Sequence, residues 1–438
     1  MSTAPQLLES VRAADWIERT GRITRFVGLA VESRGPDAHV GEICEIRSRD
    51  RASRALAEVV GFSEDHVLLM PYGDLFGIES GSEVMATGET AQAVAGPHLL
   101  GRVIDGFGAP IDGRPLDGVG IKYPLYPPPL NPLERGMVRD IFECGVRAID
   151  TLLTIARGQR VGIFSGSGVG KSTVLGMIAR QVKADVSVIA LIGERGREVK
   201  TFVEEGLSPQ ARARSVVVAA TSDQPALVRR RAAFLATAIA EYFRDQGLHV
   251  CLTMDSVTRI AMAQREIGLA SGELPTARAY TPSVFALLPR LLERGGVAAG
   301  GGSLTALYTV LVEGDDMADP IADTVRSILD GHFVLSRAVA QRARFPAIDI
   351  PQSISRLTSA IVSEAERKLI ASVVQVIALY ESSRDLIEVG AYRAGTTPAV
   401  DRAIKLVPEL EKFMAQAPDE IESRAAAMER LRRIMSEK

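Results

Sequence analysis

The chain has 438 residues, of which 46% are hydrophobic and 24% charged, with a formal net charge of −3. This length predicts roughly three domains, and the composition is typical of globular proteins with large apolar cores. The small negative charge argues against a general attraction for nucleic acid, and three widely separated cysteines (Cys44, Cys144 and Cys251) predict reduced thiols in a cytosolic protein rather than a disulfide framework.

The first twenty residues carry acidic groups and lack the long apolar core of a signal peptide. Leu7, Leu8, Val11 and Trp16 are spaced for one apolar helix face, which predicts a helix over residues 1–20. That face could pack on its own domain or bind a partner. The longest uncharged run, GGVAAGGGSLTALYTVLV, begins with glycines and suits a loop leading into a strand, so we expect no transmembrane segment.

Residues 21–95 change to short β-like runs separated by glycines, which predicts a small antiparallel barrel. This region has seven arginines and no lysine against twelve acidic residues, a net charge of −5. An acidic barrel with few aromatic residues is a poor surface for RNA or single-stranded DNA, so we expect no nucleic-acid partner.

Residues 96–355 alternate between apolar strands and helical stretches, which predicts a parallel sheet buried on both faces. The remaining residues, 356–438, have helical patterns and end in the charged amphipathic run RAAAMERLRRIMSEK. The strands expected in the sheet are RVGIF, VSVIALI, SVVVAAT, HVCLTMD, LTALYTVLV and HFVLS.

The stretch SGSGVGKST lies between the first of these strands and a helix. Small residues let backbone NH groups approach phosphate oxygens, and the following helix N-terminus favours negative charge. Lys171 would then reach the β- and γ-phosphates of a nucleotide, and the Ser172 hydroxyl would bind Mg²⁺. Ser165 occupies the place of the first glycine in the usual pattern. The expected loop comprises Ser165, Gly166, Ser167, Gly168, Val169, Gly170, Lys171, Ser172 and Thr173.

Hydrolysis needs further acidic groups, and two strand ends supply them. Asp255 ends the run HVCLTMD, where a carboxylate would support the metal's water shell, although a strand-end aspartate is also often a helix cap. Glu194 is the first charged residue after VSVIALI and would polarise the attacking water. Glu198 lies four residues further and could reach a metal-bound water. The alternative is a solvated charge cluster at Glu194, Arg195, Arg197 and Glu198.

Six motifs in one order resemble the rotary-ATPase superfamily and, within it, the flagellum-specific branch of the type III export ATPases. They are SGSGVGKST, GERGREV, MDSVTRIAMAQRE, YTPSVFALLPRLLER, EGDDMADPIADTVRSILDGHFVLSR and RFPAIDIPQSISR, and the resemblance spans roughly residues 20–410. It implies an N-terminal β-barrel, a RecA-like P-loop ATPase core of α/β class and a C-terminal helical domain. It also implies a homohexamer with ATP between neighbouring copies.

The resemblance also implies roles for individual residues. Arg195 and Arg259 would lie near the phosphates, and Phe345 would pack on adenine where the family more often has tyrosine. Arg356 would reach into the neighbouring copy's site, although on spacing alone a salt bridge near the helical domain is the better interpretation.

The expected partners and location also follow from the resemblance. A cytoplasmic regulator would bind the N-terminal helix, and a central stalk protein would contact the C-terminal domain. Export substrates, their chaperones and, indirectly, a membrane export gate would complete the set, with the protein cytoplasmic and peripheral at the inner membrane.

Three alternatives stay open on sequence grounds. The same enzyme could serve a virulence injectisome or be a catalytic subunit of a rotary ATP synthase. A ring-shaped nucleic-acid translocase shares the RecA-like core but would need a basic or aromatic N-terminal domain. A nucleotide-binding scaffold without hydrolysis would share the P-loop.

Overall fold

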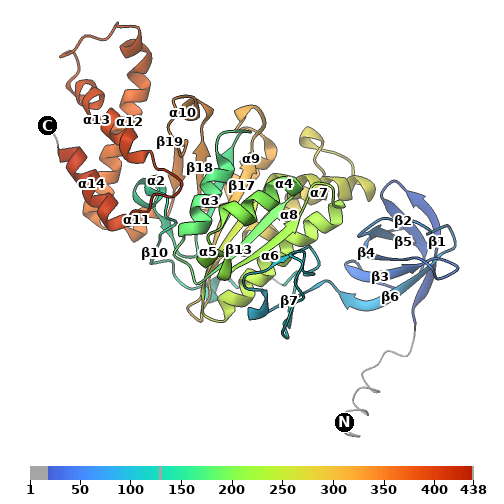
Figure 1. Ribbon diagram of the computed structural model, residues 1–438. Coiled ribbons are helices and arrows are strands. Elements are labelled where there is room, and N and C mark those ends of the chain that lie inside the picture. Colours follow the sequence, from blue (N-terminus) through green and yellow to red (C-terminus); the bar gives the residue numbers. More distant parts are fainter. Residues whose placement is uncertain (1–17, 128–130, 437–438) are drawn as a thin grey trace. The chain divides into compact units, whose positions relative to one another are not determined.

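The computed structural model describes residues 18–127 and 131–436, coloured along the chain in Figure 1. These residues form two compact units. The first holds the described residues up to Ala91 with Pro225–Leu227 and Arg265–Pro275, and the second holds the rest. The helix expected over residues 1–20 falls almost wholly on residues 1–17, which lie outside the described residues.

The first unit contains the antiparallel barrel that the sequence predicts. Its strands close in the order β1-β2-β5-β4-β3-β6. Alternate residues of β3 point inward, so Cys44 and Ile46 are buried in the barrel core. The strands are β1 (Thr20–Val27), β2 (Ala30–Arg34), β3 (Glu42–Arg47), β4 (Arg54–Ser63), β5 (His66–Pro71) and β6 (Glu83–Thr90).

The second unit is built on a 9-stranded sheet with the order β19-β18-β12-β17-β15-β13-β14-β8, to which β16 adds beside β17. All six strands expected from the sequence are present and parallel to one another. Every residue of β13 is buried, as expected for a strand covered on both faces. These strands are β12 (Arg160–Ser165), β13 (Val186–Ile192), β14 (Ser215–Ala220), β15 (His249–Asp255), β17 (Ser303–Leu311) and β18 (Gly331–Leu335).

The edge strand β19 (Ile348–Ser355) was not anticipated, and it runs antiparallel to β18. Leu335 pairs with Ile348, whereas Gly331 pairs with Ser355. The chain therefore returns along β19 from the carboxyl ends of the parallel strands to their amino ends. The short strands of this unit are β7 (Gln92–Ala95), β8 (Val103–Ile104), β9 (Ile121–Pro124), β10 (Ile141–Phe142), β11 (Ile155–Ala156) and β16 (Gly296–Val297).

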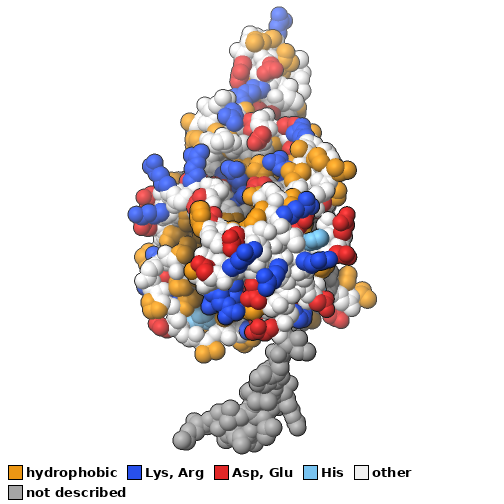
Figure 2. Space-filling view, turned by 90° about the vertical axis from the view of Figure 1, so that its right-hand side faces the viewer, with side chains coloured by type: hydrophobic (Ala, Val, Ile, Leu, Met, Phe, Trp, Pro, Cys, Tyr) orange, Lys and Arg blue, Asp and Glu red, His pale blue; other side chains and the backbone are white. Residues whose placement is uncertain are grey.

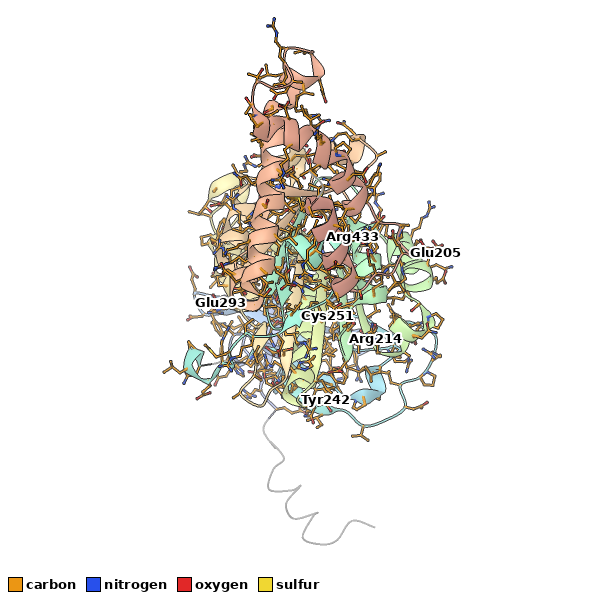
Figure 3. All side chains as sticks on the ribbon, turned by 90° about the vertical axis from the view of Figure 1, so that its left-hand side faces the viewer. Glu205, Arg214, Tyr242, Cys251, Glu293 and Arg433 are labelled. Carbon is orange, nitrogen blue, oxygen red and sulfur yellow. The ribbon has the colours of Figure 1, made fainter. Side chains whose placement is uncertain are left out.

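Helices cover both faces of the sheet (Figure 1). In Figure 3, Cys251 of β15 lies inside this layered core, where it is 1% exposed. The α-helices of this part are α2 (Arg147–Leu152), α3 (Lys171–Gln181), α4 (Gly196–Thr201), α5 (Pro209–Ala213), α6 (Ala226–Asp245), α7 (Val257–Ala270), α8 (Pro282–Leu292), α9 (Pro320–Ile328) and α10 (Arg337–Gln341). The 3₁₀ turns are η1 (Pro97–Leu99), η2 (Pro132–Glu134), η4 (Ala277–Ala279) and η5 (Glu313–Asp315), and η3 (Phe202–Gly206) is a π-helical turn.

The C-terminal part is helical, as expected, and consists of α11 (Thr358–Ile361), α12 (Glu364–Glu388), α13 (Pro398–Met414) and α14 (Arg424–Ser436). Its apolar core is continuous with that around α2 and α3, because Leu410 and Phe413 belong to the same buried cluster as Ile149 and Ile178. Burial of this shared apolar surface holds the C-terminal helices to the nucleotide-binding core.

A buried arginine reinforces this junction. The Arg147 side chain is 2% exposed and bonds to the carbonyl oxygens of Phe413 (2.9 Å) and Ala415 (2.8 Å). It also forms ion pairs with Glu420 and Glu422. A guanidinium can meet four acceptors at once because its five donors form a rigid fork.

The surface view in Figure 2 has basic and acidic side chains interspersed on the visible face. None of the described helices combines the length and the apolar character needed to cross a bilayer.

Candidate active site

The glycine-rich loop leaves β12 at Ser165 and enters α3 at Lys171. Gly168 (φ 77°) and Gly170 (φ 95°) adopt left-handed backbone conformations that favour glycine. Ser165 still belongs to the extended strand, so serine is accommodated in the place of the usual first glycine. A side chain at Gly166 would begin 2.2 Å from the Asp315 carboxylate, so a larger residue there would displace Asp315 from its present position.

Two carboxylates converge on the loop lysine. The Lys171 ammonium lies 3.1 Å from Glu194 Oε1 and also contacts Asp255 Oδ1. Asp255 is the last residue of β15, and Glu194 comes two residues after β13. Because β12, β13 and β15 are parallel, their carboxyl ends meet at one edge of the sheet, the usual ligand edge of such folds.

Asp255 is almost fully buried, with 4% of its surface exposed. Burial raises the pKa of its carboxyl above the usual range, and the nearby charge of Glu194 acts in the same direction. The Lys171 ammonium and the Thr309 hydroxyl, which donates to Asp255 Oδ1 at 2.7 Å, oppose this rise by favouring the charged form.

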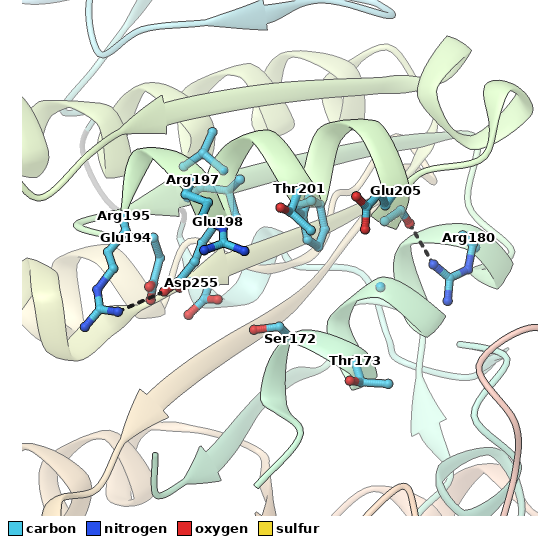
Figure 4. Close-up of a pocket in the computed structure, with 15 residues that line it drawn as sticks. Ser172, Thr173, Arg180, Glu194, Arg195, Arg197, Glu198, Thr201, Glu205 and Asp255 are labelled. Carbon is cyan, nitrogen blue, oxygen red and sulfur yellow. Dashed lines mark hydrogen bonds and ion pairs between the residues drawn. The ribbon is translucent and has the colours of Figure 1, made fainter. Parts of the chain in front are cut away.

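A cavity of about 520 Å³ opens beside these groups, between α3 and the wall formed by α4 and η3 (Figure 4). It brings together the three residues expected at a metal, because Ser172, Glu198 and Asp255 all line it. The further lining residues are Thr173, Gly176, Arg180, Leu191, Glu194, Arg195, Arg197, Val199, Thr201, Phe202, Glu205 and Gly206.

The two arginines expected near the phosphates occupy different positions. The Arg195 side chain is 84% exposed at the mouth of the cavity, with Nη1 3.9 Å from Glu198 Oε1. Arg259 instead packs over Gly193, where an added side chain would begin 2.8 Å from Arg259 Cβ. Arg259 thus supports the turn that carries Glu194.

Phe345 lies beside the loop, next to Gly170. Its ring is 3.7 Å from where a side chain at Gly170 would begin, and it is 46% exposed. The Phe345 carbonyl accepts a hydrogen bond from the Gln416 backbone at 2.9 Å. The aromatic face is therefore fixed next to the loop and open to a planar ligand.

Arg356 is the one predicted site residue that the structure does not bring to this edge. It follows β19, and its backbone NH donates to the Asp330 carbonyl at 3.0 Å. The preceding Ser355 is bonded to Gln159, immediately before β12. Arg356 therefore lies near the amino end of β12, whereas the glycine-rich loop follows the carboxyl end of the same strand. The six residues of β12 separate the two by roughly 20 Å.

Sequence reasoning missed two polar side chains around the loop, Thr309 and Arg337. Thr309 is buried on β17 beneath Asp255, and its position could have been found only from the register of β15 and β17. Arg337 donates to the Ser167 carbonyl (3.4 Å) and pairs with Asp315 (3.2 Å) on the loop's outer side. No local pattern signals these contacts, because the partners lie far apart in the sequence.

Comparison with known proteins agrees with this architecture. Family models match three consecutive parts of the chain: the ATP synthase alpha/beta family beta-barrel domain at residues 23–88, the nucleotide-binding domain of the same family at 145–355, and the T3SS EscN ATPase C-terminal domain at 362–433.

Similar full-length proteins include a flagellum-specific ATP synthase of Bacillus subtilis, 51% identical with 94% of each chain covered. A type 3 secretion system ATPase of Xanthomonas euvesicatoria is 46% identical, with 94% of this chain and 93% of the relative covered. Among solved structures, the assembled ATPase EscN from the type III secretion system of enteropathogenic E. coli superposes with a TM-score of 0.90. It is 45% identical, with 95% of this chain and all of that chain covered.

The barrel, the parallel sheet and the loop at its carboxyl edge define an ATPase of the ATP synthase alpha/beta type. Because similarity of about 50% identity extends over nearly the whole chain and includes the secretion-type C-terminal domain, the chain belongs to the family of flagellum-specific and type 3 secretion ATPases.

Proposed function

We propose that this ATPase works as a homohexameric ring and that its ATP hydrolysis energises protein export through a flagellar type III secretion apparatus. The observation that carries the hydrolytic part is the meeting of Lys171 with Glu194 and Asp255 at the end of the P-loop strand. The flagellar assignment rests on relatives of that name at 51% identity over 94% of the chain.

Within the site, Lys171 binds the transferring phosphoryl group and Glu194 orients and activates the attacking water. A triphosphate bound to the loop would attract the Lys171 ammonium, which in the structure pairs with Glu194 and Asp255. Glu194 is thereby released to bond a water. Phe345 stacks on the adenine, and Arg195 at the cavity mouth adds positive charge.

The donor chemistry suits Mg²⁺. Magnesium prefers oxygen ligands and keeps several waters, using one or two protein groups plus substrate phosphates. The Ser172 hydroxyl and the carboxylates of Asp255 and Glu198 are such groups in one cavity. Among the described residues no three His, Cys, Asp or Glu side chains form a metal cluster of their own, which fits a metal brought in with the nucleotide. Bound there, Mg²⁺ would neutralise charge on the phosphate oxygens.

The position of Arg356 supports a shared site. Lying at the opposite end of β12 from the loop, it is far beyond reach of its own Lys171, but a head-to-tail ring would place it at the next copy's phosphates. A guanidinium there would offset the charge that develops during phosphoryl transfer.

We also propose further partners for this chain. A structure of EscN in complex with its central stalk EscO superposes on this chain with a TM-score of 0.87. By analogy with that complex, we propose a central stalk partner at the C-terminal domain. A cytoplasmic regulator at residues 1–20 and contacts with export substrates, chaperones and an inner-membrane export gate are proposed on the sequence resemblance alone.

A second candidate, an injectisome ATPase, is favoured by secretion-system relatives of 46% and 49% identity. Loss of swimming with normal host-directed secretion in a deletion strain would support the flagellar assignment, and the opposite phenotype would favour the injectisome. A role as an ATP synthase catalytic subunit is disfavoured by the secretion-type C-terminal domain.

The test of the hydrolytic site is Glu194→Gln. We expect ATP binding to be retained, because the loop and metal ligands survive, and turnover to fall by about 10²–10⁴, as for loss of a general base. Glu204→Gln, an exposed substitution on η3 outside the cavity lining, is the matched control and should turn over normally. Substantial hydrolysis by Glu194→Gln would remove Glu194 from the role assigned to it.

A further inference from the structure

The segment that joins α13 to α14, residues 415–423, lies against the nucleotide-binding core, and we call it the C-terminal connector. Its Gln416 NH donates to the Phe345 carbonyl (2.9 Å), and its Gln416 side-chain amide donates to the Gly145 carbonyl (2.9 Å). Arg147 donates to the Ala415 carbonyl from the core side. The connector is thus held by several hydrogen bonds to elements that surround the loop.

The last turn of α3, the helix that begins at Lys171, also contacts the connector. Arg180 Nη2 donates to the Pro418 carbonyl at 3.1 Å. The amide of the adjacent Gln181 donates to the Glu420 carbonyl at 3.2 Å. The far end of the P-loop helix is therefore bonded to the C-terminal helical domain.

The same guanidinium also reaches the active-site cavity. Arg180 Nη1 donates to the Gly206 carbonyl at 3.1 Å, the contact drawn as a dashed line in Figure 4. Gly206 ends η3, which continues α4 without a break, and α4 carries Glu198 on the cavity wall. π-helical turns such as η3 occur frequently at functional sites, where they interrupt the regular helix.

We propose that Arg180 is a positioning residue that links the cavity wall bearing Glu198 to the C-terminal connector, so that the rate of ATP hydrolysis depends on the placement of the C-terminal helices. The planar, rigid Arg180 guanidinium bridges the carbonyl of Gly206 on η3 and that of Pro418 in the connector. A displacement of the connector would therefore shift η3 through Arg180. The inference rests on the hydrolytic site proposed above.

The chain provides a matched control for this arrangement. Arg214 also bridges two backbone carbonyls, those of Val182 (2.7 Å) and Ala184, but neither belongs to the C-terminal domain. Figure 3 labels Arg214 on the flank of the core, apart from Arg433 on α14. Arg214→Ala therefore removes the same kind of contact without touching the connector.

The test is a double-mutant cycle on kcat for ATP hydrolysis, using Arg180→Ala and Gln416→Ala in the full chain. Each single change should lower kcat with the KM for ATP within about twofold, because loop and metal ligands are intact. With the link already cut by Arg180→Ala, adding Gln416→Ala should cause little further loss, a non-additivity of about fivefold or more. Arg180→Lys, whose single ammonium cannot span both carbonyls, should stay as slow as Arg180→Ala.

Additive effects in that cycle would overturn the proposal, as would full activity of Arg180→Lys or an unchanged kcat in Gln416→Ala. The Arg214→Ala control should combine additively with Gln416→Ala. Thermal melting of every variant checks folding, and the exposed Pro418→Gly replaces Gln416→Ala in the cycle if the latter is unfolded. All these variants keep Lys171 and Glu194, so a failed coupling leaves the hydrolytic assignment intact, and the Glu194→Gln test can fail without affecting the cycle.

Discussion

Mixing two inactive variants tests the shared site most directly. Lys171→Ala removes the phosphate-binding group at the carboxyl end of β12, and Arg356→Ala removes the guanidinium at the other end. Each protein alone should be inactive, the second by about 10³–10⁵ in rate if Arg356 acts as the finger of a neighbouring site.

The expected recovery follows from the geometry. A site is intact only where one copy supplies Lys171 and its neighbour supplies Arg356, and in a random equal mixture each requirement is met half the time. With head-to-tail contacts, about a quarter of the sites are therefore complete, so activity should recover to about a quarter of the wild-type value when sites act independently.

The assay is phosphate release, measured after the variants are mixed as dilute subunits and then concentrated. A second mixture, Lys171→Ala with Glu194→Gln, is the control. Both changes fall on the same copy's half of the site, so no pairing restores it and no activity should return. If the Lys171→Ala and Arg356→Ala mixture stays as inactive as its components, Arg356 does not serve the adjoining copy and the shared site is wrong.

Two further changes test the supporting structure. Arg147→Met should cost about 3 kcal/mol of unfolding free energy in urea titrations, because it leaves Glu422 and two carbonyls without their buried cation, and a loss below about 1 kcal/mol would contradict the role given to that junction. Thr309→Val removes a donor that favours ionised Asp255, so the already raised pKa of that carboxyl should rise further. In the proposed site the ionised carboxylate supports the metal, so activity should be lost at a higher pH on acidification, whereas Thr305→Val on the same strand should leave the acid limb of the pH–kcat profile unchanged.

Most of the fold could be predicted from the sequence, because the apolar runs of the sheet strands match the burial that a parallel sheet requires. Short continuous apolar runs such as VSVIALI, alternating with helical stretches, indicate strands covered on both faces. Parallel strands then bring Glu194 and Asp255 to the same edge of the sheet as the loop. The glycines and Lys171 between a strand and a helix then mark the edge where a phosphate binds.

The unpredicted parts depend on contacts that no local pattern encodes. The segment IDIPQSIS contains Pro351, which a central strand would exclude, and it proved to be an edge strand. The bridges made by Arg180 end on backbone carbonyls, which every residue possesses, so no side-chain pattern marks them. The contact between Arg337 and Ser167 joins residues 170 positions apart.

The antiparallel edge strand has a consequence for the order in which copies work. Phe345 precedes β19 beside the copy's own loop, and Arg356 follows it at the other end of the strand. The eight residues of β19 contain a bulge and pair with only Gly331–Leu335 of β18, so the two ends of the strand are about 13 Å apart. In the shared site proposed above, this hydrogen-bonded strand has one end at its own copy's nucleotide and the other at the adjoining copy's nucleotide. Every copy in a closed ring would carry β19 in the same orientation, so a signal of nucleotide occupancy transmitted along this strand would travel around the ring in a single rotational sense.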